Sequence, residues 1–87
     1  MDLLTLLGKF ENSNWTRETV NTNNGETVSY ANNTNVTITV NSDTVITNIY
    51  RTCITHDETN IYLYIHHSKK GHLTKFELSD ISTLVIT

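Results

Sequence analysis

The segment "IYLYIHHSKKGHLTKFELS", residues 61–79, carries two alternating apolar runs on either side of a basic, histidine-rich centre. Side chains along a strand point alternately to its two faces, so this pattern predicts a β-hairpin with its turn at the centre. A loop with an even number of residues gives apolar pairs on one face: Ile65 with Phe76, and Leu63 with Leu78. A loop with an odd number would set Ile65 opposite Lys75 and divide the apolar residues between both faces. The even loop is therefore the predicted one.

The same register decides what the three histidines of this segment can do. His66 and His67 are adjacent, so their imidazoles are expected to point to opposite sides of the sheet. His72 shares the face of His67, but the predicted register sets it opposite Lys69. A structural zinc ion needs three or four ligands that converge on one point at about 2.0–2.3 Å. We therefore predict a hairpin end here, not a metal site, and we expect no cofactor.

The outward face of the predicted hairpin is aromatic and basic. Three side chains of its first strand are expected opposite three of its second: Tyr62, Tyr64 and His66 opposite Ser79, Glu77 and Lys75. Aromatic and cationic groups on an exposed sheet can anchor a protein partner or stack on bases. The alternative is an ordinary solvated strand surface, because tyrosine is a good strand former. The candidate partner-binding residues are Tyr62, Tyr64, His66, Lys69, Lys70 and Lys75.

The length of 87 residues predicts a single domain, 1–87, with a small core. Cys53 is the only cysteine and the N-terminus lacks the features of a signal peptide, which predicts a reducing, cytoplasmic setting. No stretch approaches the roughly 18 apolar residues of a membrane span, so no membrane association is expected. The formal net charge of −3 provides no general attraction to nucleic acid.

Residues 1–10 predict a short helix with Asp2 as its N-terminal cap. Four apolar side chains fall on one face at helical spacing: Leu3, Leu6, Leu7 and Phe10. We expect this face to pack across the open end of a sheet.

Residues 15–31 predict a β-hairpin arm, with strands near 16–22 and 26–30. Its turn is assigned to Asn24-Gly25, because both central residues of a type I′ turn need positive φ. Apolar side chains are few in this hairpin, which predicts a position at the edge of a sheet or as an arm.

The region 36–87 predicts the remaining sheet or small barrel. Val36, Ile38 and Val40 alternate with threonines, and turn-forming residues follow at 41–43. The segment 44–55 is mostly β-branched, yet its apolar pairs recur every four residues, so the pattern fits both a strand and a partly helical segment. We assign it to one long strand that bends or bulges, so that different faces point inward at its two ends.

From residue 36 onward, the order of elements is similar to that of the small five-stranded barrels of SH3-like and Sm-like proteins. In those proteins a leading helix caps the barrel and a single helical turn separates the last two strands. Ser79-Asp80-Ile81 would be that turn, and "ITHDETN" (residues 54–60) supplies the Asp57 and Asn60 of an Sm-like turn. The predicted fold is mainly β: a short N-terminal helix before an antiparallel meander or SH3-like barrel of about five to seven strands. The Sm-like resemblance also implies a ring-like oligomer that binds RNA.

No group of residues forms a convincing catalytic set. Cys53 and His56 could be imagined as nucleophile and base, but residues three apart in a strand project to opposite faces. We therefore predict a non-enzymatic binding module, an accessory or inhibitor protein of the phage or mobile-element type, which binds a host protein or nucleoprotein complex through an exposed β face. The alternative is an Sm-like oligomeric RNA-binding protein. An enzyme that uses Cys53 or His56 is a third hypothesis.

Overall fold

The computed structural model describes residues 1–13, 15–22, 25–31, 36–67 and 72–87. Within these residues it contains one α-helix, eight strands and one turn of 3-10 helix. In chain order these are α1 (Leu3–Glu11), β1 (Thr16–Thr22), β2 (Gly25–Ala31), β3 (Ile38–Val40), β4 (Thr44–Ile46), β5 (Ile49–His56), β6 (Ile61–His67), β7 (His72–Glu77), η1 (Leu78–Asp80) and β8 (Leu84–Ile86). The prediction of a mainly β fold behind a short N-terminal helix is confirmed.

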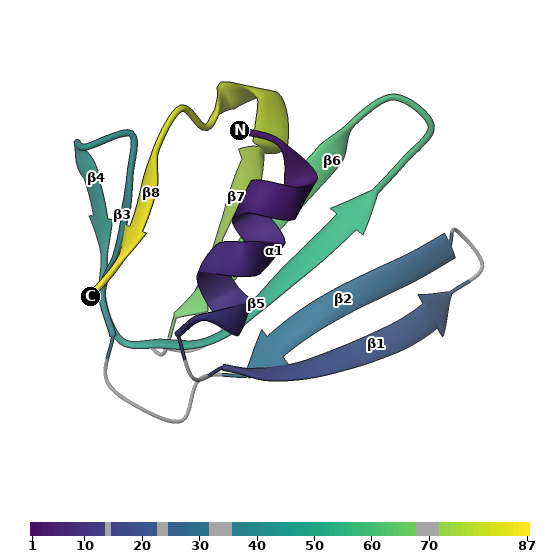
Figure 1. The fold of residues 1–87 in the computed structure, drawn as a ribbon, viewed down its shortest axis with the longest axis horizontal. Coiled ribbons are helices and arrows are strands. Elements are labelled where there is room, and N and C mark those ends of the chain that lie inside the picture. Colours follow the sequence, from purple (N-terminus) through teal and green to yellow (C-terminus); the bar gives the residue numbers. More distant parts are fainter. Residues whose placement is uncertain (14, 23–24, 32–35, 68–71) are drawn as a thin grey trace.

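The strands form two antiparallel sheets (Figure 1). The larger sheet has the order β1-β2-β5-β6-β7 and the smaller has the order β4-β3-β8. Helix α1 lies over the larger sheet and beside β8. The strand count exceeds the predicted number of about five to seven because the segment 44–55 is divided between the two sheets as β4 and β5.

Helix α1 begins where the sequence predicts. The carboxylate of Asp2 accepts a hydrogen bond from the backbone N–H of Thr5 at 2.8 Å, which satisfies one of the free donors of the first turn. Leu6 and Phe10 are fully buried, and Leu3 and Leu7 pack against the core from the same side. This apolar stripe fixes which face of the helix meets the sheet.

The core fills the space enclosed by the two sheets and the helix. The Phe10 ring stacks on Tyr30 with centroids 5.1 Å apart and meets Trp15 edge to face at 5.2 Å. The larger sheet adds the fully buried Leu63 and Ile65. The smaller sheet adds three fully buried side chains: Ile38, Val40 and Leu84.

The segment 44–55 contains no helical turn, since residues 44–46 and 49–55 are strand and 47–48 form a bend, so the helical alternative is wrong. Its first part pairs with β3 and its second part with β6, and the chain changes sheets at Thr47 and Asn48. Asn48 has a φ of 56°, a left-handed conformation that asparagine tolerates better than β-branched residues do. A register shift between Ile49 and Arg51 adds a bulge. The predicted bend and bulge are present, but the segment forms two strands in two sheets and not the one long strand that the sequence predicted.

The hairpin formed by β6 and β7 has the predicted faces but a different register. Leu63 pairs with Phe76, not with Leu78, and Ile65 pairs with Thr74. This shift of two residues leaves every side chain on its predicted face, because the side-chain repeat of a strand is two. Leu78 is absent from the ladder because it begins η1, where its side chain is buried in the core.

The N-terminal hairpin is part of the larger sheet. β2 pairs with β5 along Val28–Ala31, and β1 forms the sheet edge. Thr22 pairs with Gly25, so Gly25 belongs to β2 and the assignment of the turn to Asn24-Gly25 is wrong. Residues 23–24, which separate the two strands in the sequence, lie outside the described residues.

The turn predicted at 41–43 is present, and the helical turn predicted at 79–81 is displaced by one residue. Asn41 and Ser42, with φ of 56° and 64°, turn the chain between β3 and β4. The side chain of Asn41 also holds the segment before β8: its Nδ2 donates to the carbonyl of Asp80 at 2.9 Å, and its Oδ1 accepts from the backbone N–H of Ser82 at 2.7 Å. The helical turn η1 begins one residue before the predicted motif Ser79-Asp80-Ile81.

Candidate partner-binding face

The outward face of β5, β6 and β7 carries the residues that the sequence predicts as a binding surface. Tyr62, Tyr64 and His66 are half-buried and point away from the core, because the alternate residues Leu63 and Ile65 are fully buried on the other side. We call this outward surface the tyrosine face and define it by Tyr50, Arg51, Tyr62, Tyr64, His66 and Lys75. The lysines Lys69 and Lys70, also predicted to bind, lie outside the described residues.

The cross-strand partners of the tyrosines differ from the predicted ones. Glu77 lies opposite Tyr62, and Lys75 lies opposite Tyr64. The predicted partners were Ser79 and Glu77, each two residues further along the chain. The observed register brings the Lys75 ammonium to 4.2 Å from the centre of the Tyr62 ring and 5.6 Å from that of Tyr64. At these distances the cation is attracted by the electron-rich ring faces.

Two residues of the tyrosine face were missed from the sequence. The Tyr50 side chain is 46% exposed, and its ring lies 5.9 Å from the ring of His66. Arg51 is the cross-strand partner of His66, so it shares the outward face. Strict alternation would send Tyr50 and Arg51 to opposite sides of the sheet, and the bulge between Ile49 and Arg51 is what brings them together. The recurrence of apolar pairs every four residues in 44–55 is the signal that could have located this bulge.

Asp57 fixes one end of the tyrosine face. Its carboxylate accepts hydrogen bonds from the backbone N–H groups of Thr59 at 2.8 Å and Asn60 at 2.7 Å, and from the Tyr62 hydroxyl at 2.9 Å. These bonds stabilise the ionised form and lower the pKa of Asp57 to about 2. The turn between β5 and β6 therefore holds the hydroxyl of Tyr62, and Lys75 on β7 lies over the face of its ring.

The electrostatic balance of the face is mixed. Arg51 and Lys75 are its described cations, and Glu77 lies at its edge opposite Tyr62. Partial burial, and then the nearby Arg51 and His67, lower the pKa of His66 below its ordinary value. This shift favours the neutral imidazole, which offers an aromatic surface with one donor and one acceptor nitrogen.

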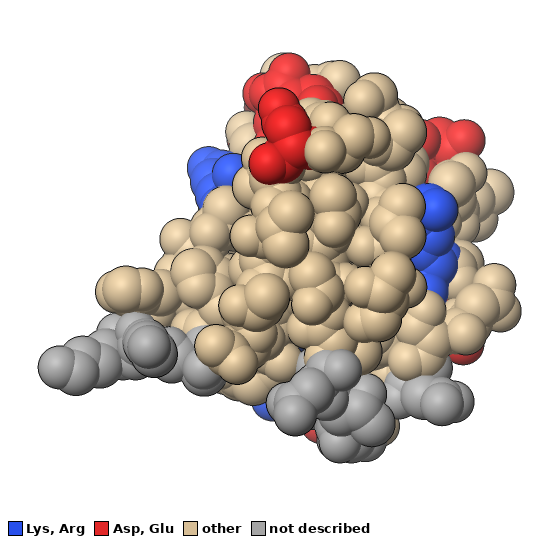
Figure 2. All heavy atoms as spheres, turned by 90° about the vertical axis from the view of Figure 1, so that its left-hand side faces the viewer, with Lys and Arg blue, Asp and Glu red and all other residues tan. Residues whose placement is uncertain are grey.

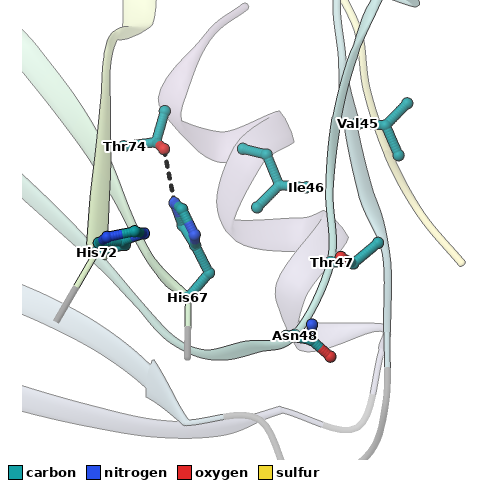
Figure 3. Close-up of a pocket in the computed structure, with 7 residues that line it drawn as sticks. All are labelled: Val45, Ile46, Thr47, Asn48, His67, His72 and Thr74. Carbon is teal, nitrogen blue, oxygen red and sulfur yellow. Dashed lines mark hydrogen bonds between the residues drawn. The ribbon is translucent and has the colours of Figure 1, made fainter. Parts of the chain in front are cut away.

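The other two histidines lie on the inner side of the hairpin. His67 and His72 are cross-strand partners with ring centroids 5.9 Å apart, so the prediction that His72 faces Lys69 is wrong. Both line a cleft between β4 and the hairpin (Figure 3). Among the described residues, no group of three or more His, Cys, Asp or Glu side chains could hold a metal ion.

Cys53 and His56 do not form a catalytic pair in the described structure. Cys53 is the partner of Tyr64 on the outward side, whereas His56 is the partner of Ile61 three residues further along β5. The thiol instead donates to the hydroxyl of Ser29 at 3.6 Å. The alternation therefore places the thiol and the imidazole on opposite faces of the sheet.

No family model, no characterised protein and no solved structure matches this chain. The resemblance to SH3-like and Sm-like barrels therefore stays a prediction based on the order of elements. No helix in the described part of the chain is long and apolar enough to cross a membrane.

Proposed function

We propose that this chain is a non-enzymatic binding module, acting as an accessory or inhibitor protein, and that the tyrosine face binds a protein or nucleoprotein complex. The observation that supports this most directly is the preorganised Tyr62–Lys75–Tyr64 cluster. Rigid aromatic side chains lose little conformational entropy on binding and are common at interface centres. Here the Asp57 carboxylate and the Lys75 ammonium hold Tyr62 before any partner arrives.

A protein surface fits this face better than a strand of bases. Stacking on bases needs free ring faces, and the ammonium of Lys75 already lies over Tyr62. A protein partner can instead contact the ring edges and hydroxyls and place a carboxylate near Arg51 or Lys75. The expected partner surface is therefore apolar at its centre and acidic at its rim.

The test uses the wild-type chain and a double variant, Tyr64→Ala with Lys75→Glu, as baits in an extract of cells that naturally express the protein. Leu4→Ala is the control, because Leu4 is 82% exposed on helix α1 and lies outside the face. We expect a captured protein set that Leu4→Ala retains and the double variant loses, with equal far-UV circular dichroism for all three chains. Retention of the same proteins by the double variant would show that the tyrosine face is not the binding surface.

A second candidate function is the binding of single-stranded RNA by an Sm-like oligomer. The Tyr50–His66 ring pair supports it, because both rings lie on the tyrosine face beside Arg51. It predicts that a fluorescein-labelled oligouridine binds with an affinity that falls steeply with salt, by a slope of about −0.7 per phosphate contact. It also predicts a mass above that of one chain by light scattering. A monomer that retains no oligouridine at low salt would exclude this candidate.

A further inference from the structure

A cleft of about 380 Å³ lies between β4 and the inner side of the β6–β7 hairpin (Figure 3). One of its walls is a continuous piece of chain, residues 45–48. The other wall is formed by His67, His72 and Thr74. Val45 and Ile46 are the last two residues of β4, so the end of this strand runs along the cleft.

The hydrogen-bond pattern shows which backbone groups β4 presents there. Thr37 and Thr87 exchange both of their backbone hydrogen bonds, and the N–H of Asn41 donates to the carbonyl of Thr83. The backbone N–H and C=O groups of alternate residues in β3 therefore point to β8. The backbone N–H and C=O groups of Ile38 and Val40 therefore point to β4, where their partners are Ile46 and Thr44. Alternation along β4 directs the N–H and C=O of Val45 away from β3. Among the described strands, only β3 pairs with β4.

The opposite wall supplies polar groups without negative charge. The imidazole of His67 is hydrogen-bonded through Nε2 to the Thr74 hydroxyl at 2.8 Å, which holds the ring upright in the cleft. His72 is exposed and lies next to it. None of the described residues that line the cleft is Asp or Glu. The pair of imidazoles can therefore donate hydrogen bonds to a carboxylate that enters the cleft.

The surface next to this edge is also suited to an added strand. Figure 2 shows the side of the molecule that carries β4, β3 and β8, and most of it belongs to uncharged residues. The exposed side chains of Val45 and Val85 flank Thr39 in one cross-strand row. A strand added beside β4 would extend this row with its own outward side chains.

We propose that the cleft beside β4 binds an extended peptide segment of a partner protein, which pairs with the backbone of Val45 and places an Asp or Glu side chain against His67 and His72. Backbone pairing with an open edge provides affinity, and the side-chain pocket provides sequence preference. A second copy of β4 fits less well, because Thr44–Ile46 has no carboxylate to offer the imidazoles. This site is separate from the tyrosine face.

The test is selection from a phage-displayed library of random peptides, with wild-type and Val45→Pro chains as baits. Proline removes the outward N–H of Val45 and no hydrogen bond to β3, and it is tolerated on edge strands. Val45→Thr is the matched control because it keeps the N–H. We expect enriched peptides with alternating β-branched residues and one Asp or Glu. The Val45→Pro variant and the double variant His67→Ala with His72→Ala should each bind these peptides at least tenfold more weakly than the wild type does. Val45→Thr and the tyrosine-face variant Tyr64→Ala with Lys75→Glu should bind them as the wild type does.

Two further measurements keep the outcome decisive if a variant folds poorly. A selected peptide methylated at its pairing backbone nitrogens should lose affinity for the unchanged wild-type chain, and amide exchange at Val45 should slow when the unmethylated peptide is bound. Failure to enrich any peptide over the Val45→Pro bait would overturn the proposal. It would also be overturned by enriched peptides whose binding depends on Tyr64 and Lys75, or by a wild-type dimer that Val45→Pro makes monomeric, since the edge would then serve a second copy.

Discussion

Replacing Leu63 by alanine measures the packing of the β6–β7 hairpin directly. Leu63 is fully buried, with Ile54 and Phe76 as its partners on the neighbouring strands. Removing its outer carbons forfeits their transfer free energy and leaves a cavity, which together cost about 3 kcal/mol for a Leu→Ala change in a well-packed core. A domain of this length is stable by roughly 4–13 kcal/mol, so the loss is large.

The assay is urea unfolding followed by far-UV circular dichroism, with Leu73→Ala as the matched control. Leu73 is on the outward side of the same hairpin, opposite His66, and is 49% exposed. The same truncation there should cost less than about 1 kcal/mol. If Leu63→Ala unfolds too readily to measure, Leu63→Met should cost less than about 1.5 kcal/mol, because it conserves volume. Equal losses for Leu63→Ala and Leu73→Ala would show that the assignment of inner and outer faces is wrong.

Three further predictions concern the turn, the bend and the tyrosine face. Above about pH 4 the low pKa of Asp57 stabilises the folded chain, and this contribution is lost as the pH falls through about 2. In thermal unfolding, the stability of the variant Asp57→Asn should therefore change less than that of the wild type between pH 2 and 5. An unchanged dependence on pH would contradict the role given to the carboxylate. Because Asn48 has a positive φ, Asn48→Val should destabilise the fold by about 1–2 kcal/mol in urea unfolding, whereas Asn48→Gly should be nearly neutral. Equal effects of the two substitutions would contradict the bend at this residue. A double-mutant cycle of Lys75→Met and Tyr62→Leu should report a coupling of about 0.5–1 kcal/mol, whereas a coupling near zero would show that the ammonium does not rest on the ring in solution.

Local patterns in the sequence predicted much of the fold. The cap at Asp2, the apolar stripe of α1 and the turn at 41–43 each depend on neighbouring residues, and all three are present. The inward direction of Leu63 and Ile65 is of the same kind, because alternation is a property of the strand itself. The same alternation, together with the apolar pairs across the hairpin, directs Tyr62 and Tyr64 outward. Whether those tyrosines bind a partner stays a prediction.

Other features could not be obtained from neighbouring residues. The composition of the tyrosine face depends on the bulge in β5, which adds Tyr50 and Arg51 beside His66. The open edge of β4 depends on where the chain changes sheets at Asn48. Both are set by how distant strands pair, and the four-residue recurrence of apolar pairs in 44–55 does not by itself say which strands those are.

The sequence alone determined which side of each strand is apolar, because consecutive side chains along a strand alternate between its two faces. Only the tertiary structure decided which residues meet across the strands. Leu78 left the ladder to fill the core from η1, and the hairpin register moved by two residues, so that Lys75 faces Tyr64 and His67 faces His72. The physical reason is that a shift of two residues keeps every side chain on its face, so the burial of the whole core selects among registers that the local pattern cannot distinguish.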